Sequence, residues 1–289
     1  MGFGIEASFM SKKTGPYQVV DLPAARRHIP TVIDVIWWKH WIYGLLEVDV
    51  TVVRNFIKEY EARTGQQLSF TGYLAYCLAQ AVDQDKSIQA VRKGSRELLV
   101  FEDVDALIIM ERKTDGTRTP VGHVVRGADK KSYLEINQEI QEKQTGQTTP
   151  DTGLSLVMKL FLRLPWPFLD WLPSLMRAAA RFNPLAMVAG GGTVGISAVG
   201  MFGEHSGWGL APGGHSLDLV VGGITRRPAY VDERIEPREF LSLTVAFDHD
   251  VVDGAPAARF VERLLDLIES GYGLEEIGQA PEAQTVTPA

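Results

Sequence analysis

The pattern of apolar and polar residues changes most sharply between residues 240 and 269. Apolar side chains alternate at Leu241, Leu243, Val245 and Phe247, which is the period of a strand with one buried face. The chain then reads "DHDVVDG" before apolar residues return at helical spacing in "APAARFVERLLDLIE". The pattern predicts a strand, a short polar turn that contains a histidine, and an amphipathic helix.

The remaining apolar patterns also mix strands and helices, and no internal repeat is visible. Residues 47–65 indicate a strand that runs into a helix, for which Thr51 is the expected N-cap. Because strands and helices do not alternate regularly, we expect an α+β fold, a mixed β-sheet flanked by helices. The other predicted helices lie at residues 69–85 and 131–144, and the other predicted strands lie at 98–112, 118–126 and 216–231.

Residues 153–188 differ from the rest of the chain in composition. They are very apolar but are interrupted by prolines and charged residues, so no uncharged run approaches the roughly 20 residues of a membrane-spanning helix. Two interpretations stay open: a helical insert packed on the protein or a neighbouring subunit, and an interfacial helix in peripheral contact with a membrane. We expect one domain over residues 1–277 that contains this insert, followed by a flexible polar tail over 278–289.

The composition narrows the class of protein. A net charge of -7 argues against a nucleic-acid-binding protein, which normally carries a basic surplus. Cys77 is the single cysteine, so the chain can form neither an internal disulfide nor a cysteine-rich metal site. The first residues lack the charged start and apolar core of a signal peptide, and we therefore expect a cytoplasmic protein.

The histidine of the turn is the first candidate for chemistry. His249 follows a predicted strand end, where functional loops commonly begin, and a neutral imidazole there can act as a general base. Asp253 follows four residues later, and Gly254 permits a tight backbone turn. A metal site formed with Asp248 and Asp250 is the alternative, but the spacing matches neither a zinc motif nor the EF-hand loop, and we expect no metal.

Five stretches together resemble one known family. Residues 46–51, "LEVDVT", and 68–82, "LSFTGYLAYCLAQAV", resemble the family's strand, helix and helix. Residues 246–261, "AFDHDVVDGAPAARFV", are similar to the DHRxxDG signature of the dihydrolipoamide acyltransferases of 2-oxo-acid dehydrogenase complexes. Residues 118–140, "RTPVGHVVRGADKKSYLEINQEI", and residues 191–203, "GGTVGISAVGMFG", resemble further family stretches in the same order. The resemblance covers most of residues 45–147 and 190–270. It implies the chloramphenicol acetyltransferase-like fold, which forms trimers.

The resemblance also implies a role for each matching residue. His249 would be the general base that deprotonates an acceptor thiol, and Ser197 would donate a hydrogen bond to the oxyanion of the tetrahedral intermediate. Asp253 would brace the site through an ion pair. In the family the histidine and the serine come from two neighbouring subunits, and coenzyme A and dihydrolipoamide enter the shared channel from opposite sides. The resemblance predicts no coenzyme-binding residue here; the supporting positions would be Thr193, Asp248, Asp250 and Gly254.

The chain departs from the family at informative places. Asp250 stands where the family has an arginine, so any ion pair made by that arginine must be rearranged. We expect a stand-alone form without a lipoyl domain, so a lipoyl group would have to come from another chain. Residues 32–50 are unusually aromatic, and Arg26 or Arg27 is the candidate for a basic residue that the family carries near its N-terminus.

Two functional hypotheses follow from the resemblance. The first is a coenzyme A-dependent acyltransferase that moves an acyl group between acyl-coenzyme A and a thiol such as dihydrolipoamide, with a lipoyl-bearing protein as a candidate partner. The second is an oligomeric scaffold, a cage or a membrane-associated assembly protein built on the same core with weak or no catalysis, which Asp250 would favour. Family cages join through an apolar C-terminal helix, so the polar residues 278–289 favour a homotrimer over a cage.

Overall fold

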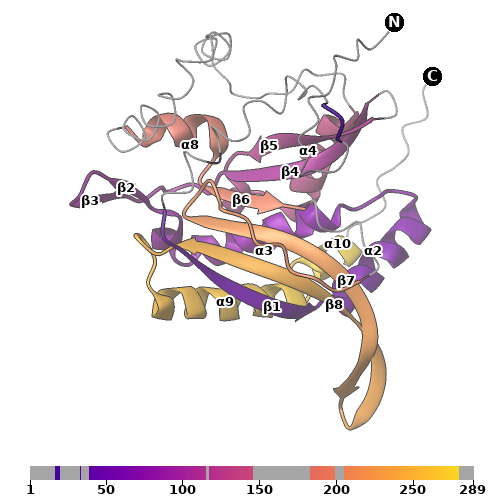
Figure 1. The fold of residues 1–289 in the computed structure, drawn as a ribbon. Coiled ribbons are helices and arrows are strands. Elements are labelled where there is room, and N and C mark those ends of the chain that lie inside the picture. Colours follow the sequence, from indigo (N-terminus) through magenta and orange to yellow (C-terminus); the bar gives the residue numbers. More distant parts are fainter. Residues whose placement is uncertain are drawn as a thin grey trace, which may run out of the picture.

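The computed structural model describes residues 17–19, 33, 39–114, 117–145, 183–198 and 205–279, and Figure 1 shows their arrangement. The strands are β1 (Trp41–Asp49), β2 (Val91–Lys93), β3 (Glu97–Leu99), β4 (Ala106–Thr114), β5 (Thr117–Val125), β6 (Val194–Ser197), β7 (Leu217–Val231) and β8 (Arg234–Asp248). The α-helices are α2 (Thr51–Thr64), α3 (Phe70–Asp83), α4 (Tyr133–Thr145), α8 (Leu185–Gly191), α9 (Gly254–Glu269) and α10 (Leu274–Gln279). Two short 3-10 helices are η2 (Lys86–Gln89) and η3 (Ala128–Lys130).

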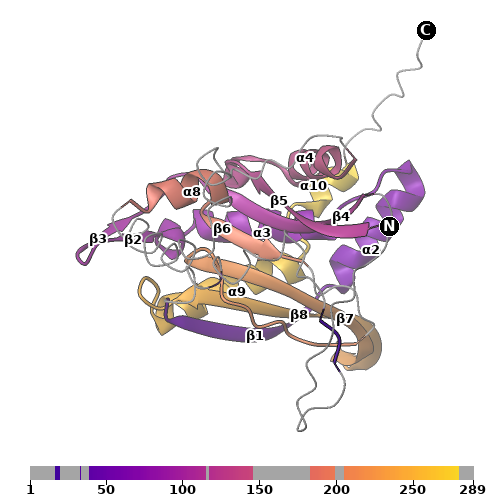
Figure 2. The ribbon, with the colours of Figure 1, turned by 45° about the horizontal axis from the view of Figure 1, so that its top comes forward.

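Six strands form one mixed sheet in the order β1-β8-β7-β6-β4-β5, and β2 and β3 form a separate hairpin. The short strand β6 runs parallel to both of its neighbours, β4 and β7, whereas the other pairs are antiparallel. The predicted α+β fold with a mixed sheet is therefore confirmed. Figures 1 and 2 both place α8 beside the β2–β3 hairpin, at the end of the sheet where β8 finishes.

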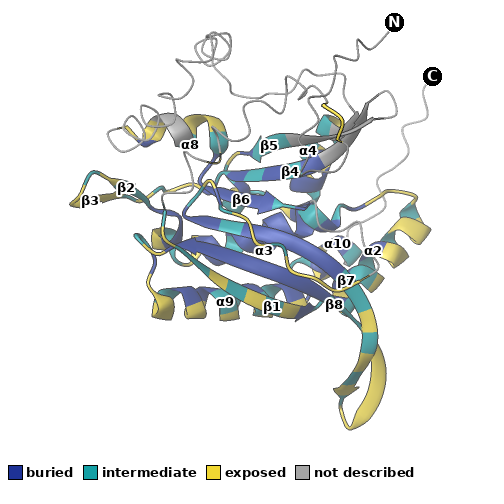
Figure 3. Cartoon of the chain, viewed as in Figure 1, coloured by how far each residue is buried: buried dark blue, intermediate teal, exposed yellow. Residues whose placement is uncertain are grey.

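One face of the sheet is closed by helices, among them α3 and α9. The alternating residues Leu241, Leu243, Val245 and Phe247 of β8 point to this face and are buried. Phe247 meets Phe260 of α9 edge to face, with ring centroids 5.8 Å apart. Complete burial of a side chain of this kind contributes about 1.5–3 kcal/mol to folding. Figure 3 shows buried residues along the central strands and the inner helices, so the predicted strand, turn and helix are anchored in the core.

The opposite face of the sheet is crossed by residues 205–216, the loop that precedes β7 in Figure 1. The backbone N–H of Gly207 donates to Ser242 Oγ at 3.2 Å, and Trp208 Nε1 donates to the carbonyl of Leu46 at 2.8 Å. The loop lies so close that a Cβ atom at Gly222 would be 2.1 Å from the carbonyl oxygen of Gly207. This approach requires glycine in β7 at that position.

The predicted cap of the helix after β1 is wrong. Thr51 is the first residue of α2, and Val50 occupies the N-cap position without a side-chain bond. The Thr51 hydroxyl instead accepts the backbone N–H of Glu239 at 2.8 Å, and Asp49 Oδ1 accepts the N–H of Thr51 at 2.9 Å. The hydrogen bond to the Thr51 hydroxyl thus connects the first residue of α2 to β8.

The single strand predicted over residues 98–112 is also wrong, because it divides into β3 and β4. The side-chain amide of Gln89 donates to the carbonyls of Phe101 at 2.9 Å and Asp103 at 3.2 Å. These bonds hold the chain between the two strands against η2, outside either sheet.

Most of the predicted insert and tail lie outside the described residues. The structure describes residues 183–188 of the insert, which lead into α8, and residues 278–279 of the tail. Arg26 and Arg27 also lie outside the described part of the chain. None of the described helices has the length and apolar character that a membrane-spanning segment requires. Contact of residues 153–188 with a membrane stays a prediction.

Candidate active site

His249 lies in the turn between β8 and α9. The turn is closed by the carbonyl of Asp248, which accepts the backbone N–H groups of Val251 at 3.0 Å and Val252 at 2.9 Å. The N–H of His249 donates to the carbonyl of His40, just before β1, at 2.7 Å. Backbone hydrogen bonds therefore fix the position of His249, while 44% of its side chain stays exposed.

The Asp248 side chain makes structural contacts in this turn. The residue is 4% exposed, and its Oδ1 accepts the backbone N–H of Asp250 at 3.1 Å. Its Oδ2 lies 3.4 Å from Lys39 Nζ, which also donates to the carbonyl of His215 at 2.9 Å. The carboxylate thus ties the end of β8 to the segment before β1.

Asp250 has side-chain partners on two other segments. Its Oδ1 accepts a hydrogen bond from His40 Nδ1 at 2.9 Å, and its Oδ2 lies 3.5 Å from an Nη atom of Arg92 in β2. In this contact the carboxylate is on the turn and the guanidinium is on the neighbouring hairpin.

Ser197 ends β6, and the structure does not bring it to His249 within one chain. In the sheet, Ser197 pairs with Val220 of β7, which pairs with Thr244 of β8. Ser197 is thus two strands away from β8 and level with a residue five positions before His249. With strands about 4.8 Å apart and residues about 3.4 Å apart along a strand, the two backbones are separated by about 20 Å. This distance excludes joint contact with one reacting group inside a single chain.

Asp253 and Gly254 begin α9. Asp253 is the N-cap residue, and its carbonyl accepts the N–H of Ala257 at 3.0 Å, but its side chain caps no N–H group. Its carboxylate is 87% exposed and lies 3.8 Å from His249 Nδ1, which is beyond a hydrogen bond. A Cβ atom at Gly254 would meet nothing within 4 Å, and its φ is not positive. The described contacts therefore leave room for a side chain at this position.

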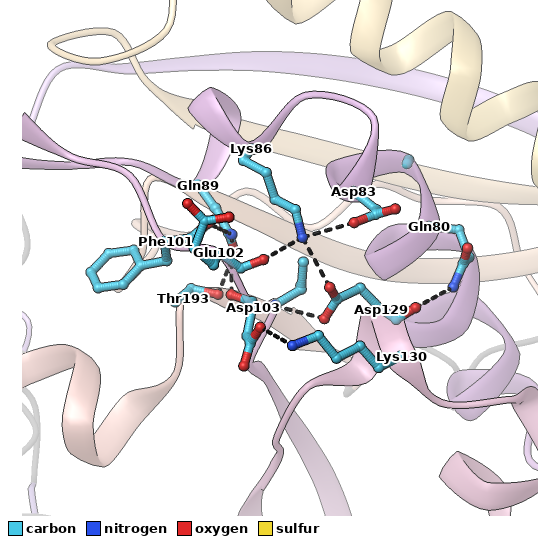
Figure 4. Close-up of polar contacts among 12 residues, drawn as sticks. Gln80, Asp83, Lys86, Gln89, Phe101, Glu102, Asp103, Asp129, Lys130 and Thr193 are labelled. Atoms are coloured by element: carbon cyan, nitrogen blue, oxygen red, sulfur yellow. Dashed lines mark hydrogen bonds and ion pairs between the residues drawn. The ribbon is translucent and has the colours of Figure 1, made fainter.

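Thr193 has a structural role at the start of β6. Its hydroxyl donates to Gln89 Oε1 at 2.6 Å and accepts the backbone N–H of Asp105 at 3.0 Å. Figure 4 shows this contact beside a second group centred on Lys86, whose Nζ lies 2.9 Å from Asp129 Oδ2. Asp129 Oδ1 in turn accepts the backbone N–H of Val104 at 2.8 Å. The network holds β6 and η3 against the chain before β4.

Sequence reasoning missed a partly buried ion pair beside β6. His215 Nδ1 is 2.8 Å from Asp218 Oδ1, and His215 Nε2 is 2.8 Å from the carbonyl of Gly191. Both ring nitrogens face oxygen atoms that can accept a hydrogen bond, an arrangement that favours the protonated imidazolium. Burial opposes this charge, but Asp218 and the Gly191 carbonyl outweigh it and raise the pKa of His215. A Cβ atom at Gly195 would be 2.0 Å from Asp218 Oδ1, so a glycine in β6 is the sequence signal of this pair.

The stability of the fold should depend on this pair in a pH-dependent way. The folded-state pKa of His215 is raised above the unfolded value of about 6.5. The contribution of the His215–Asp218 pair to the free energy of unfolding is therefore complete below that pH. It is lost as the pH rises through the raised pKa. We expect the Tm difference between wild type and Asp218→Asn to be about 2–4 °C larger near pH 6 than near pH 9. A difference that does not change with pH would contradict the assignment; Asp103→Asn, which breaks an exposed pair without histidine, is the control.

A cavity of about 450 Å³ borders the turn that carries His249. Its walls come from α8 and the start of β6, from the β2 end of the hairpin, and from the segment before β1. Asp248 and Asp250 line it from the turn, and Arg92, Lys39 and His40 face them. The size is in the usual range for a small-molecule site. Within the described ranges, no group of three or more His, Cys, Asp or Glu side chains forms a metal-binding arrangement.

Comparison with known proteins identifies the class of this fold. The chain superimposes on the cubic core of the pyruvate dehydrogenase multienzyme complex with a TM-score of 0.65 at 19% identity, covering 91% of this chain and 96% of that chain. The dihydrolipoamide acetyltransferase of Azotobacter vinelandii gives a TM-score of 0.65 at 20% identity, again covering 91% and 96% of the two chains. The fold is therefore that of the catalytic cores of these acyltransferases.

The sequence comparisons point to the same family. Residues 178–274 match the 2-oxoacid dehydrogenases acyltransferase (catalytic domain) family. The chain is 25% identical over 230 residues to the probable dihydrolipoyllysine-residue succinyltransferase component of the 2-oxoglutarate dehydrogenase complex of Schizosaccharomyces pombe. That match covers 77% of this chain and 43% of the relative, so the chain spans less than half of the relative's length. The resemblance to this acyltransferase family, expected from the sequence, is confirmed.

Proposed function

We propose that this chain is the catalytic core of a coenzyme A-dependent acyltransferase that moves an acyl group between acyl-coenzyme A and a thiol such as dihydrolipoamide. The observation that carries the proposal is the β8–α9 turn, which presents a half-exposed imidazole from a rigid backbone in a fold shared with dihydrolipoamide acyltransferase cores. A cytoplasmic location and a lipoyl-bearing protein as the source of the acceptor are part of the same proposal.

In the proposed reaction His249 Nε2 takes the proton of the acceptor thiol. The thiolate attacks the carbonyl carbon of the acyl thioester and forms a tetrahedral intermediate, whose oxyanion accepts a hydrogen bond from Ser197 Oγ. The intermediate collapses, the bond to the coenzyme A sulfur breaks, and the departing thiolate recovers the proton from His249. The Asp253 carboxylate, 3.8 Å from Nδ1, favours the tautomer with its proton on Nδ1 and leaves Nε2 free to accept one.

The separation of about 20 Å between Ser197 and His249 leads us to propose that the site forms between two copies of the chain. The surface supports this arrangement. Tyr43, Leu45, Trp208 and Leu210 are exposed apolar residues on β1 and on the loop that crosses the outer face of the sheet, with exposures of 39–63%. A group of exposed large apolar side chains is typical of a subunit interface. A homotrimer, in which each interface holds one histidine and one serine, satisfies both observations.

Asp250 favours the enzyme over a scaffold without catalysis. In a site that had lost its activity, we would expect a carboxylate at this position to have no hydrogen-bond or ion-pair partner. This carboxylate contacts both His40 and Arg92. The two residues that flank His249 are thus both held in place.

The proposal is tested by incubating the protein with acetyl-coenzyme A and dihydrolipoamide and following thioester formation and release of free coenzyme A. We expect transfer by the wild type and none above background by His249→Gln. If wild type and variant are equally inert with acetyl-, butyryl- and succinyl-coenzyme A, the enzymatic proposal fails.

A further inference from the structure

The residues around Asp250 connect three segments that are distant in the sequence. Asp250 belongs to the β8–α9 turn, His40 precedes β1, and Arg92 lies in β2. The same His40 that donates its ring N–H to Asp250 also accepts the backbone N–H of His249 through its carbonyl, at 2.7 Å. Two neighbouring residues of the turn are therefore fastened to a single residue outside it.

The orientation of Asp250 is fixed from three directions. Its backbone N–H is held by Asp248 Oδ1 at 3.1 Å, one carboxylate oxygen by His40 at 2.9 Å, and the other faces Arg92 at 3.5 Å. Arg92 is itself oriented, because its Nε donates to the carbonyl of Gly94 at 3.1 Å. The carboxylate thus connects the β2–β3 hairpin to the backbone that presents His249.

The exposure of these groups indicates what the contacts can contribute. The side chains of Arg92 and His40 are 37% and 78% exposed, and that of Asp250 is 20% exposed. Ion pairs at such exposure contribute little to the stability of a fold. A displacement of about 1 Å of a catalytic group, in contrast, can reduce a rate about 100-fold. These contacts should therefore add little to the stability of the fold. They lie beside His249, however, where a small displacement of the imidazole would change the rate of catalysis.

We propose that Asp250, Arg92 and His40 form a clamp that positions His249 for proton transfer. The inference rests on the proposed function of His249. Asp250 is a positioning residue: it acts on His249 through the His40 backbone and the shape of the turn, and it needs no contact with substrate.

The test is a charge-swap series: Asp250→Arg, Arg92→Asp and the double variant, with Glu97→Lys as matched control. Glu97 pairs with Lys93 at 3.2 Å in the same hairpin, so its reversal disturbs a similar ion pair without touching the turn. We expect Asp250→Arg to lower kcat at least ten-fold, with KM for acyl-coenzyme A within two-fold and Tm lowered by no more than about 4 °C. The double variant should recover at least three-fold of the lost kcat, and Glu97→Lys should match the wild type.

Hydrogen–deuterium exchange of the peptide that contains His249 gives a readout that does not depend on turnover. Exchange should be faster in Asp250→Arg, because the new arginine loses the hydrogen bond from His40 and is repelled by Arg92, and slower again in the double variant. Equal kcat losses and equal exchange in the single and double variants would overturn the clamp. If the wild type transfers no acyl group, the proposed function fails and exchange alone decides: restored protection in the double variant supports the clamp, and unchanged protection in all variants rejects it.

Discussion

Replacement of His249 by glutamine is expected to lower kcat for acyl transfer by about 100- to 10,000-fold, the range that a general base contributes. Glutamine fills a similar space and keeps the backbone N–H that donates to His40, so the turn itself should stay in place. Its amide cannot take a proton from a thiol at neutral pH. The effect should therefore fall on kcat, measured by release of coenzyme A at saturating acceptor.

A matched control for this variant is His205→Gln, because His205 is an exposed histidine in the loop before β7. Its kcat should equal that of the wild type, and the Tm of His249→Gln should lie within about 2 °C of the wild type because the imidazole makes no hydrogen bond within the described part of the chain. A His249→Gln enzyme that keeps more than a tenth of the wild-type kcat would show that another group is the base.

Replacement of Ser197 by alanine is expected to reduce kcat by about 100- to 1,000-fold, the usual effect of removing one oxyanion donor. The change deletes one oxygen atom at the end of β6 and leaves the backbone pairing with Val220 intact. Because the hydrogen bond forms with the tetrahedral intermediate, KM for acyl-coenzyme A should change little.

Thr225→Val is the matched control for the serine variant. It also removes a hydroxyl from a strand of the same sheet, and the Thr225 Oγ1 atom is buried without a hydrogen-bond partner among the described residues. This variant should be as active as the wild type. If Ser197→Ala behaves like Thr225→Val, the oxyanion is stabilised elsewhere and the role given to Ser197 is wrong.

The sequence was sufficient to predict the parts of the site that depend on local pattern. The alternation from Leu241 to Phe247 predicts which face of β8 is buried, and the polar residues that follow predict where the strand ends. His249 must then lie in the turn before α9. Ser197 could be selected only through the family resemblance, since a serine at a strand end has no distinguishing pattern of its own.

The contacts made across the fold could not be predicted in this way. Asp250 meets His40, which is 210 residues away, and no periodicity or spacing connects the two positions. The same applies to Thr51, whose hydroxyl accepts the backbone N–H of Glu239 and caps no N–H group of its own helix. Tertiary contacts decide the use of polar side chains that local rules assign to caps and turns.

The central claim is that His249 of one copy and Ser197 of another act on the same thioester, and mixed oligomers test it most directly. His249→Gln and Ser197→Ala chains, each nearly inactive alone, would be co-expressed with different tags and the doubly tagged oligomers purified. Once the doubly tagged oligomers are purified, each mixed trimer has one interface out of three that joins an intact histidine to an intact serine, so about a third of wild-type kcat per chain should return. Mixed oligomers as inactive as either parent would contradict a site shared between two copies.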